Sequence, residues 1–222
     1  MKRSLTICLA LCTAVLSTAC SDSACDSDLA AGGMAVVRAM PQTVTAEAAY
    51  AHRVCLIHEG VVTQAVSAAS AAALATFRVE PGTYGMLAVA AADEENLTFP
   101  AAEGIALSEY GVRITDMTAP IPDLLIGCNG HFEAAVGSVS APIAMKRAVA
   151  HLTVTVVGLE ALSCESITVL IPRMYDWITS DGTPGNSGTG FSEKTIVLAR
   201  NSAGLYVGQA IVLPTDTTSA TL

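Results

Sequence analysis

Residues 143–157 read IAMKRAVAHLTVTVV, and this stretch decides the fold class. In its second half, Leu152, Val154 and Val156 alternate with polar side chains. Alternation with a period of two, rich in β-branched residues, predicts a strand that buries one face and exposes the other to solvent. Gly158 ends the run. We therefore expect one long β-strand over this stretch.

The segments on both sides of this run repeat the pattern in shorter form. The expected strands cover 53–58 and 61–66 around a Glu59-Gly60 turn, 77–80 and 83–90 around a Pro81-Gly82 turn, and then 112–114, 123–127, 167–171, 195–198, 205–207 and 210–213. The first two are expected to form a β-hairpin. Residues 67–75 are Ala-rich and predict a loop with helical tendency, while 93–109 and 180–190 read as surface loops.

Helical periodicity is nearly absent, and strands do not alternate with helices. The sequence therefore predicts an all-β fold, an antiparallel sandwich or a pair of sandwiches. This argues against Rossmann-like and barrel enzymes, which need alternating strands and helices.

The N-terminus carries an export signal. Lys2-Arg3 precedes an apolar run at 4–16 that is too short to span a bilayer comfortably, and small residues at 17–19 lead into Cys20. Residues 17–19 satisfy the small-x-small rule of ordinary signal peptidase, whereas Cys20 followed by a polar stretch is similar to a lipobox. We favour lipidation of Cys20, with residues 1–19 removed as the signal peptide. The lipid would attach the chain to a membrane surface without spanning it.

The exported part of the chain is strongly acidic. The whole sequence holds 11 Lys+Arg against 20 Asp+Glu, and loss of residues 1–19 removes two of the basic residues. Binding to nucleic acid or anionic lipid needs clustered Lys or Arg, so we expect neither. Residues 20–45 are small and polar, and they predict a flexible tether between the lipid and the folded part.

The sequence has no recognisable catalytic motif. It lacks a nucleophile turn, a P-loop, a zinc-protease helix motif and a dinucleotide fingerprint. A hydrolase would require Cys55, Cys128 or Cys164 close to His131 or His151. Without a nucleophile turn, we expect no catalytic residue and no enzyme activity.

Neither cofactor nor metal is expected. His52 and His58 could share one face of a strand, but no third ligand is identifiable. The acidic run at 93–95 lacks EF-hand spacing and predicts a solvated loop. Lys146-Arg147 could be a protease-recognised or ligand-binding pair, but we favour edge charges that prevent unwanted strand pairing.

Cysteine pairing stays open. The cysteines that follow Cys20 form no CxxC, so a structural zinc site is not expected. They could form disulfides in an exported chain or stay as isolated buried thiols. They are Cys25, Cys55, Cys128 and Cys164.

Several stretches, in order, resemble fimbrial subunits of Bacteroides-type bacteria, the fimbrillin-like and anchor subunits of type V pili. They are the lipoprotein start at Cys20, RVCLI at 53–57, VEPGTY at 79–84 followed by LAVA at 87–90, PDLLIG at 122–127, and IAMKRAVAHLTVTV at 143–156. The family pairs an "x-Pro-Gly-x-Tyr" strand with a later "Met-x-Arg-x-x-Ala" strand. The resemblance covers most of the chain from residue 53 to residue 172.

The resemblance implies two transthyretin-like β-sandwich domains, which we place at 46–135 and 136–222. The second is short for the family. It also implies a surface-exposed lipoprotein of the outer membrane that takes part in a fimbrium and in cell adhesion. The expected partners are other fimbrial subunits, joined by strand exchange. The donor strand by this analogy is Ala210, Ile211, Val212 and Leu213.

Two questions of role stay open. Stalk subunits of the family are trimmed after an arginine, for which Arg38 or Arg53 could serve, whereas a subunit that keeps its lipid acts as the anchor. The alternative function is a surface lipoprotein that binds glycan or peptide. The low aromatic content argues against glycan binding, because a sugar-binding surface needs exposed aromatic rings and Trp177 is the single tryptophan.

Overall fold

The computed structural model describes residues 33–43, 50–70, 72–73, 75–101, 103–159, 164, 166–188 and 190–216. Regular structure in these residues consists of strands and one 3-10 turn, η1 (Leu107–Glu109). The expected all-β sandwich class is therefore confirmed, while the transthyretin-like type stays a prediction. No helix in the described part is long and apolar enough to cross a membrane. Cys20 and Cys25 lie outside the described residues.

The strands form four sheets. Sheet A has the order β4 (Thr76–Val79), β1 (Ala35–Gln42), β9 (Gly137–Ala144). Sheet B has the order β10 (Lys146–Arg147), β8 (Leu124–Ala134), β5 (Gly82–Ala91), β2 (Ala51–His58), β3 (Val61–Ala68). Sheet C has the order β14 (Pro184–Gly185), β13 (Trp177–Thr179), β7 (Gly111–Ile114), β6 (Leu97–Thr98). Sheet D has the order β11 (Ala150–Val156), β16 (Tyr206–Val212), β15 (Ser192–Arg200), β12 (Ser166–Met174). Neighbouring strands are antiparallel except β1 and β9, which run parallel.

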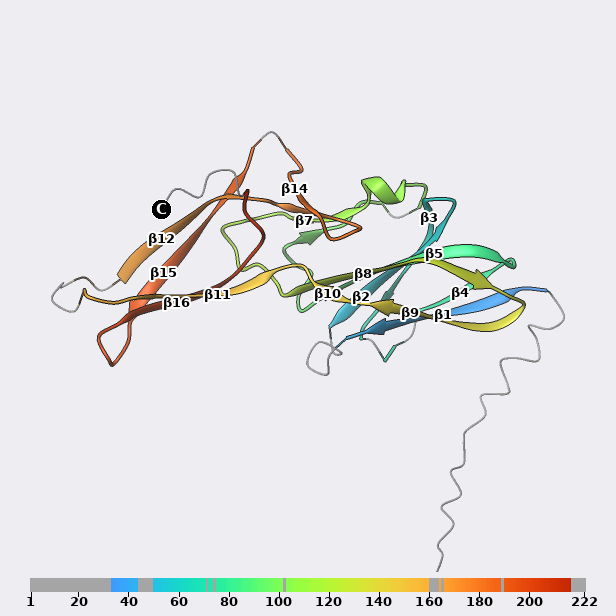
Figure 1. The fold of residues 1–222 in the computed structure, drawn as a ribbon, viewed down its shortest axis with the longest axis horizontal. Helices are drawn as coiled ribbons and strands as arrows, with labels where there is room; N and C mark the ends of the chain where they lie inside the picture. The colour runs from blue at the N-terminus through green and yellow to red at the C-terminus, as the bar shows by residue number, and fades with distance from the viewer. Residues whose placement is uncertain are drawn as a thin grey trace, which may run out of the picture.

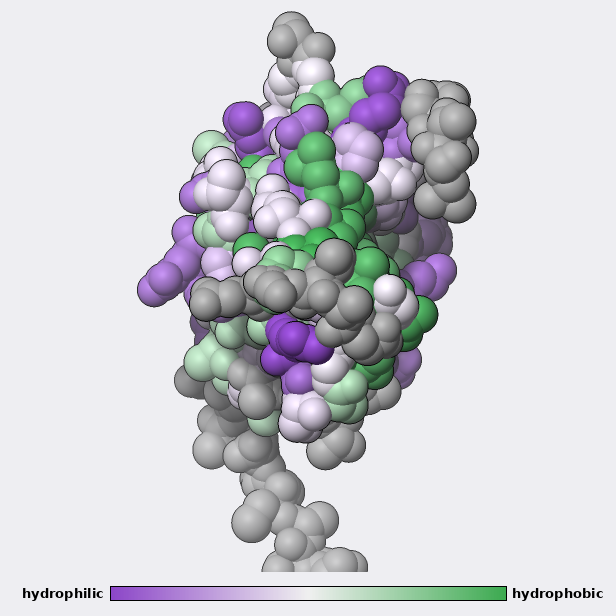
Figure 2. Space-filling model, turned by 90° about the vertical axis from the view of Figure 1, so that its left-hand side faces the viewer, coloured by the Kyte–Doolittle hydropathy of each residue, from purple (hydrophilic) through white to green (hydrophobic). Residues whose placement is uncertain are grey.

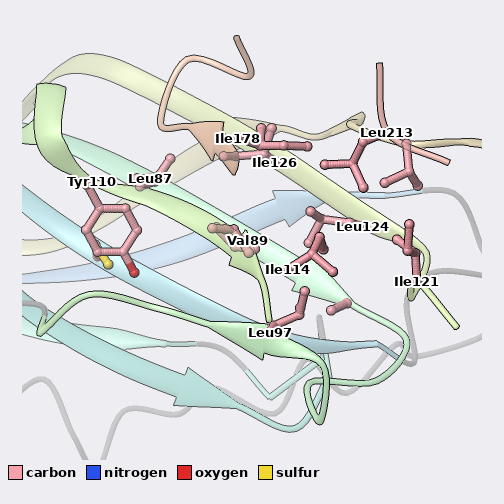
Figure 3. Packing of buried hydrophobic residues seen from close by; sticks show 14 of the residues in the cluster. Leu87, Val89, Leu97, Tyr110, Ile114, Ile121, Leu124, Ile126, Ile178 and Leu213 are labelled. Carbon is pink, nitrogen blue, oxygen red and sulfur yellow. The ribbon is translucent and has the colours of Figure 1, made fainter. Parts of the chain in front are cut away.

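Sheet B is the middle layer of the body, with sheet A on one face and sheet C on the other (Figure 1). Strand β5 shows why both faces are covered. Leu87 and Val89 belong to the core under sheet C, whereas Met86 and Ala88 belong to the core under sheet A. Because side chains alternate along a strand, a run that is apolar at every position buries both faces. Figure 3 shows how the core under sheet C gathers side chains from many strands.

The predicted hairpin is confirmed. Strands β2 and β3 pair antiparallel, and the turn between them has positive φ at Glu59 (51°) and Gly60 (76°). Two consecutive positive φ values suit the tight turn of a right-twisted hairpin. The turn at Pro81 is also confirmed, but β4 and β5 lie in different sheets, so it is a corner between layers.

The long strand expected over 143–157 is wrong. The stretch divides into the end of β9, the short β10 and then β11, which lie in three different sheets. The alternation holds in β11 but breaks at Lys146-Arg147, whose two adjacent charges lie at the edge of sheet B, as expected for edge charges. Conversely, the separate strands expected at 205–207 and 210–213 are one strand, β16.

The tether expected over 20–45 is wrong for residues 35–42, which form β1. Ala35, Val37 and Ala39 are fully buried there. Their small side chains suggested a tether, but pairing with β9, about a hundred residues later, buries them.

Strands from both sides of residue 136 share sheets. Strands β9 and β10 join strands of the N-terminal half, and β13 pairs with β7. The division into domains at 46–135 and 136–222 stays a prediction.

Candidate interaction surface

Sheet D forms one end of the elongated molecule (Figure 1). Its inner face carries an apolar cluster whose fully or nearly fully buried members are Ile196, Leu198 and Tyr206. The side chains around them are half-buried, namely Leu152, Val154, Val156, Leu159, Cys164, Ile167, Val169, Ile171 and Ala210. All the described members come from sheet D itself or from the segment between β11 and β12, so sheets A to C do not close this cluster.

The end of the molecule that sheet D forms therefore exposes apolar surface. Figure 2 looks at this end and shows hydrophobic residues in a band down its centre, flanked by hydrophilic ones. On the opposite face of the sheet, between the buried Ile196 and Leu198, Val197 is 61% exposed, and Val157 just after β11 is 67% exposed. A contiguous apolar patch rimmed by polar residues is typical of a protein interaction site.

A polar cluster around Asp123 joins this sheet to the body. The Asp123 carboxylate accepts two hydrogen bonds from Arg147, at 2.8 Å and 2.9 Å, and one from the Tyr50 hydroxyl at 3.0 Å. The His151 ring, at the start of β11, lies 3.6 Å away. Burial alone would raise the pKa of Asp123, but the hydrogen bonds from Arg147 and Tyr50 outweigh it and hold that pKa below its usual value.

Lys194 makes a second connection between sheet D and the body. This side chain lies in β15 and is only 6% exposed. Its ammonium donates hydrogen bonds to the backbone carbonyls of Met117 (2.9 Å), Thr118 (3.3 Å) and Ala119. Burial lowers the pKa of Lys194. The three carbonyls fix β15 to the loop that precedes Pro120.

Between β15 and β16 the sheet opens. The two strands pair only at Ala199–Val207 and Arg200–Tyr206, next to the turn that joins them. Strand β16 pairs with β11 along seven residues, and β15 pairs with β12 along most of its length. Beyond Gly208 the facing edges of β15 and β16 therefore have no strand partner among the described residues.

We call this opening the β15–β16 slot. It is a cavity of about 590 Å³. Its lining is Thr118, Pro120, Ile121, His151, Leu152, Thr153, Lys194, Thr195, Ile196, Val197, Gln209, Ala210 and Ile211.

The predicted donor strand forms one wall of the slot. Ala210, Ile211 and Val212 lie in β16, paired with β11, and Leu213 is 2% exposed. The donor role is not tested by this placement and stays a prediction. Sequence reasoning missed Lys194, although a signal existed. Lys194 lies two residues before Ile196 and four before Leu198, so its side chain faces the same side of the strand. This spacing predicts a buried ammonium group that needs hydrogen-bond acceptors.

The hydrolase candidates have separate surroundings. The Cys55 thiol lies against the Tyr110 hydroxyl, and burial raises the pKa of Cys55. Cys164 lies 3.1 Å from the Tyr206 hydroxyl. Cys128 is exposed on β8. His131 and His151 each face a carboxylate, that of Glu133 and Asp123 respectively.

The two histidines of β2 do not act together. His52 is buried, with Nδ1 2.7 Å from the Tyr50 carbonyl, and burial lowers its pKa. His58 stacks on Tyr84 at a ring distance of 4.9 Å. The acidic run at 93–95 is an exposed turn in which the Glu95 amide donates to Asp93. Within the described ranges, no three His, Cys, Asp or Glu residues gather as metal ligands.

Comparison with known proteins shows the fold. No protein-family model and no curated protein matches the chain. The fimbrial anchor protein Mfa2 from Porphyromonas gingivalis matches with a TM-score of 0.60 and 13% identity, over 82% of this chain and 73% of that one. A candidate adhesin from Bacteroides thetaiotaomicron matches with a TM-score of 0.60 and 12% identity, over 83% and 71%. A candidate polysaccharide-binding protein from the same species matches with a TM-score of 0.60 and 10% identity, over 81% and 71%.

The chain thus has the fold of fimbrial and adhesin proteins of these bacteria. At 10–13% identity the likeness shows the fold alone. The resemblance to fimbrial subunits that the sequence motifs indicate is confirmed for the fold.

Proposed function

We propose that the chain is a structural fimbrial lipoprotein, an anchor or minor subunit that serves pilus assembly and adhesion at the outer membrane. The observation that carries this proposal is the fold shared with a fimbrial anchor protein and a candidate adhesin. The unclosed apolar face of sheet D supports it, because a subunit of an assembly needs a surface that a partner completes.

The lipid on Cys20 would set the distance from the membrane. Ala35, where β1 begins, lies fifteen positions after Cys20. A chain advances at most about 3.6 Å per residue, so the start of β1 can lie no further than about 54 Å from the lipidated residue. This reach suits a subunit that holds a filament close to the cell surface.

The surroundings of the two candidate trimming sites favour an anchor over a stalk subunit. Arg38 lies in the middle of β1, which pairs with β4 on one side and β9 on the other. Arg53 lies in β2, between β3 and β5. A protease binds its substrate as an extended free segment, so cleavage after either arginine requires a strand to leave the interior of its sheet.

Strand exchange with other fimbrial subunits belongs to the proposal. An open strand edge beside apolar surface is a template for an added strand. For Ala210, Ile211, Val212 and Leu213 to act as donors, β16 must first leave β11, with which it pairs along its whole length.

Replacement of Cys20 tests the anchor. We expect Cys20→Ala to abolish incorporation of labelled fatty acid and to move the protein from the outer-membrane fraction to the soluble fraction. High-molecular-weight fimbrial ladders should decrease with it. Cys25→Ala is the matched control and should change neither. Unchanged labelling in Cys20→Ala would rule out the lipid anchor, and ladders that never contain the chain would rule out the fimbrial role.

Glycan binding is the second candidate function. One similar structure is a candidate polysaccharide-binding protein, which favours it. The aromatic content is 5%. The single tryptophan, Trp177, lies against Gly111 and Gly185, so its ring is partly covered by the backbone. Capture of a defined glycan by the purified Cys20→Ala protein, with no fimbrial association in cells, would favour this candidate.

A further inference from the structure

We infer that the outer face of sheet C holds a binding site for a neutral oligosaccharide, in which a sugar ring stacks on the Trp177 indole. Glycan binding is the second candidate function, and this site rests on it but not on the fimbrial role. The site consists of the indole, two further aromatic rings, hydrogen-bond donors beside the indole and an adjoining cavity.

Trp177 points away from the core under sheet C. Val112 and Ile178 belong to that core, and side chains alternate along a strand, so Trp177 and its partner Arg113 point to the outer face. Trp177 is only partly buried, and it belongs to none of the three apolar clusters of the described residues. A large ring kept outside every core is typical of a binding surface.

Two glycines make room for the indole on the sheet. Gly111 lies in β7 and Gly185 in β14, on opposite sides of β13. A Cβ at Gly111 would lie 2.4 Å from Cζ2 of the indole, and one at Gly185 would lie 3.4 Å from Cδ1. The ring therefore spans the sheet from one neighbouring strand to the other. Because the backbone covers its inner side, the exposed part of Trp177 is the side that faces solvent.

Two further aromatic rings extend this surface. Met174 and Ile178 are buried, whereas Tyr175 and Trp177 between them are partly exposed, so these two rings share one side of the chain. Tyr175 meets Phe191 edge to face at a ring distance of 5.4 Å, and Phe191 is also partly exposed. Residues 175–191 thus hold three of the ten Trp, Tyr and Phe residues of the chain, and all three lie outside the apolar clusters.

Hydrogen-bond donors lie beside the indole. The Arg113 side chain is 49% exposed, and its Nε lies 3.6 Å from the Asp176 carboxylate. Neither the Arg113 guanidinium nor the Trp177 Nε1–H donates a hydrogen bond to any described residue. A pyranose ring carries C–H bonds on its faces and hydroxyls on its rim. It can therefore stack on the electron-rich face of the indole while its hydroxyls accept these hydrogen bonds.

The charges around the site favour a neutral ligand. Asp176 offsets the charge of Arg113. The exposed Asp181 carboxylate follows the end of β13, and hydrogen bonds from Thr179 and Thr183 lower its pKa, so it is ionised at neutral pH. An acidic sugar would meet this carboxylate and find the arginine already balanced, which disfavours it.

A cavity of about 590 Å³ continues the site beyond the indole. Thr179 lines this cavity and pairs with Gly111, over which the indole lies. Ser108, Asp181 and Thr183 add further polar groups to the lining. The volume is in the range of small-molecule sites, and hydroxyl and carboxylate groups suit the hydroxyls of further sugar units. We therefore expect an oligosaccharide to bind better than a single sugar.

A glycan array tests the site with the purified full chain that carries Cys20→Ala. The array holds neutral oligosaccharides beside acidic ones. We expect the chain to bind a neutral oligosaccharide, and titration with that glycan should change the fluorescence of Trp177, the single tryptophan. Preferential binding of acidic glycans would overturn the inference. Binding of no glycan at all would overturn both the site and the second candidate function.

Three variants locate the bound glycan. Trp177→Ala and Arg113→Ala should each weaken binding by about tenfold or more. Arg113 is exposed, so its variant keeps the test valid if loss of the indole unfolds sheet C. Arg78→Ala is the matched control, because it removes an exposed arginine from β4 in sheet A, and it should bind like wild type. Binding that is unchanged in both site variants would overturn the site and leave the second candidate function standing.

Recovery of the same variants in fimbriae separates the site from the fimbrial role. Entry of Trp177→Ala and Arg113→Ala at the wild-type level, together with loss of glycan binding, supports a site that is distinct from assembly. Loss of both variants from fimbriae with glycan binding retained would overturn the site and assign this face of sheet C to subunit contact.

Discussion

Gly111 is one of the positions where the fold leaves least room for a side chain. It lies in β7, opposite Thr179 of β13. A Cβ added there would lie 2.4 Å from the Trp177 ring and 2.5 Å from the Ile178 carbonyl oxygen, whereas ordinary contacts begin at 3.4 Å. Gly111→Ala must therefore push β13 or the indole away by about 1 Å. The β7–β13 pairing joins segments more than sixty residues apart in the chain, so this movement disturbs sheet C.

The expected cost of Gly111→Ala follows from two opposing effects. Overpacking of a well-filled site costs about 1–3 kcal/mol and occasionally more. The lower entropy of the unfolded alanine chain returns about 0.4–1 kcal/mol. We expect the free energy of unfolding to fall by about 2 kcal/mol.

Urea unfolding followed by the fluorescence of Trp177, the single tryptophan, measures this cost directly. Gly130→Ala is the matched control, because a Cβ at Gly130 meets nothing within 4 Å and its φ is not positive. We expect this variant to be neutral or slightly stabilised. A Gly111→Ala protein as stable as wild type, or equal losses in both variants, would refute the packing argument.

Three further predictions concern the polar and thiol groups. Asp123→Asn should lower the free energy of unfolding by about 1–2 kcal/mol at pH 7, because it weakens the pair with Arg147. Folding lowers the pKa of Asp123, so its contribution to stability is fully present above the unfolded pKa of about 3.9. The difference in stability between wild type and variant should begin to shrink below about pH 4 and disappear once the pH is below the folded pKa. A thiol reagent should modify the exposed Cys128 in the native protein and the buried Cys55 only after unfolding, and equal rates would contradict the described burial. Lys194→Met should speed amide exchange in the loop at 117–119 and lower the free energy of unfolding by about 1–2 kcal/mol. Unchanged exchange in this loop would contradict the role of the Lys194 hydrogen bonds in holding it.

Much of the strand content could be predicted from sequence because burial leaves a local pattern. The alternation in β11 and the hairpin turn at Glu59-Gly60 are properties of adjacent residues, and they predict the structure correctly. Strand β1 could not be predicted in this way. Its small residues are buried by pairing with β9, which no local window contains.

The candidate slot also lies beyond local patterns. Whether β15 and β16 pair or diverge depends on what holds each strand, and these attachments come from the distant loop before Pro120 and from the core around Leu213. The Asp123–Arg147 pair joins residues 24 positions apart across a strand break. Lys194 was the missed local signal, since a lysine in phase with buried residues predicts a cation that needs partners.

The central claim is that this chain works as a component of a surface fimbrium. Mass spectrometry of cross-linked, purified fimbriae from cells that produce the chain tests it most directly. We expect cross-links between other fimbrial subunits and residues of sheet D, and loss of surface-attached fimbriae when the chain is deleted. Fimbriae that contain no cross-link to the chain and remain attached without it would contradict the claim.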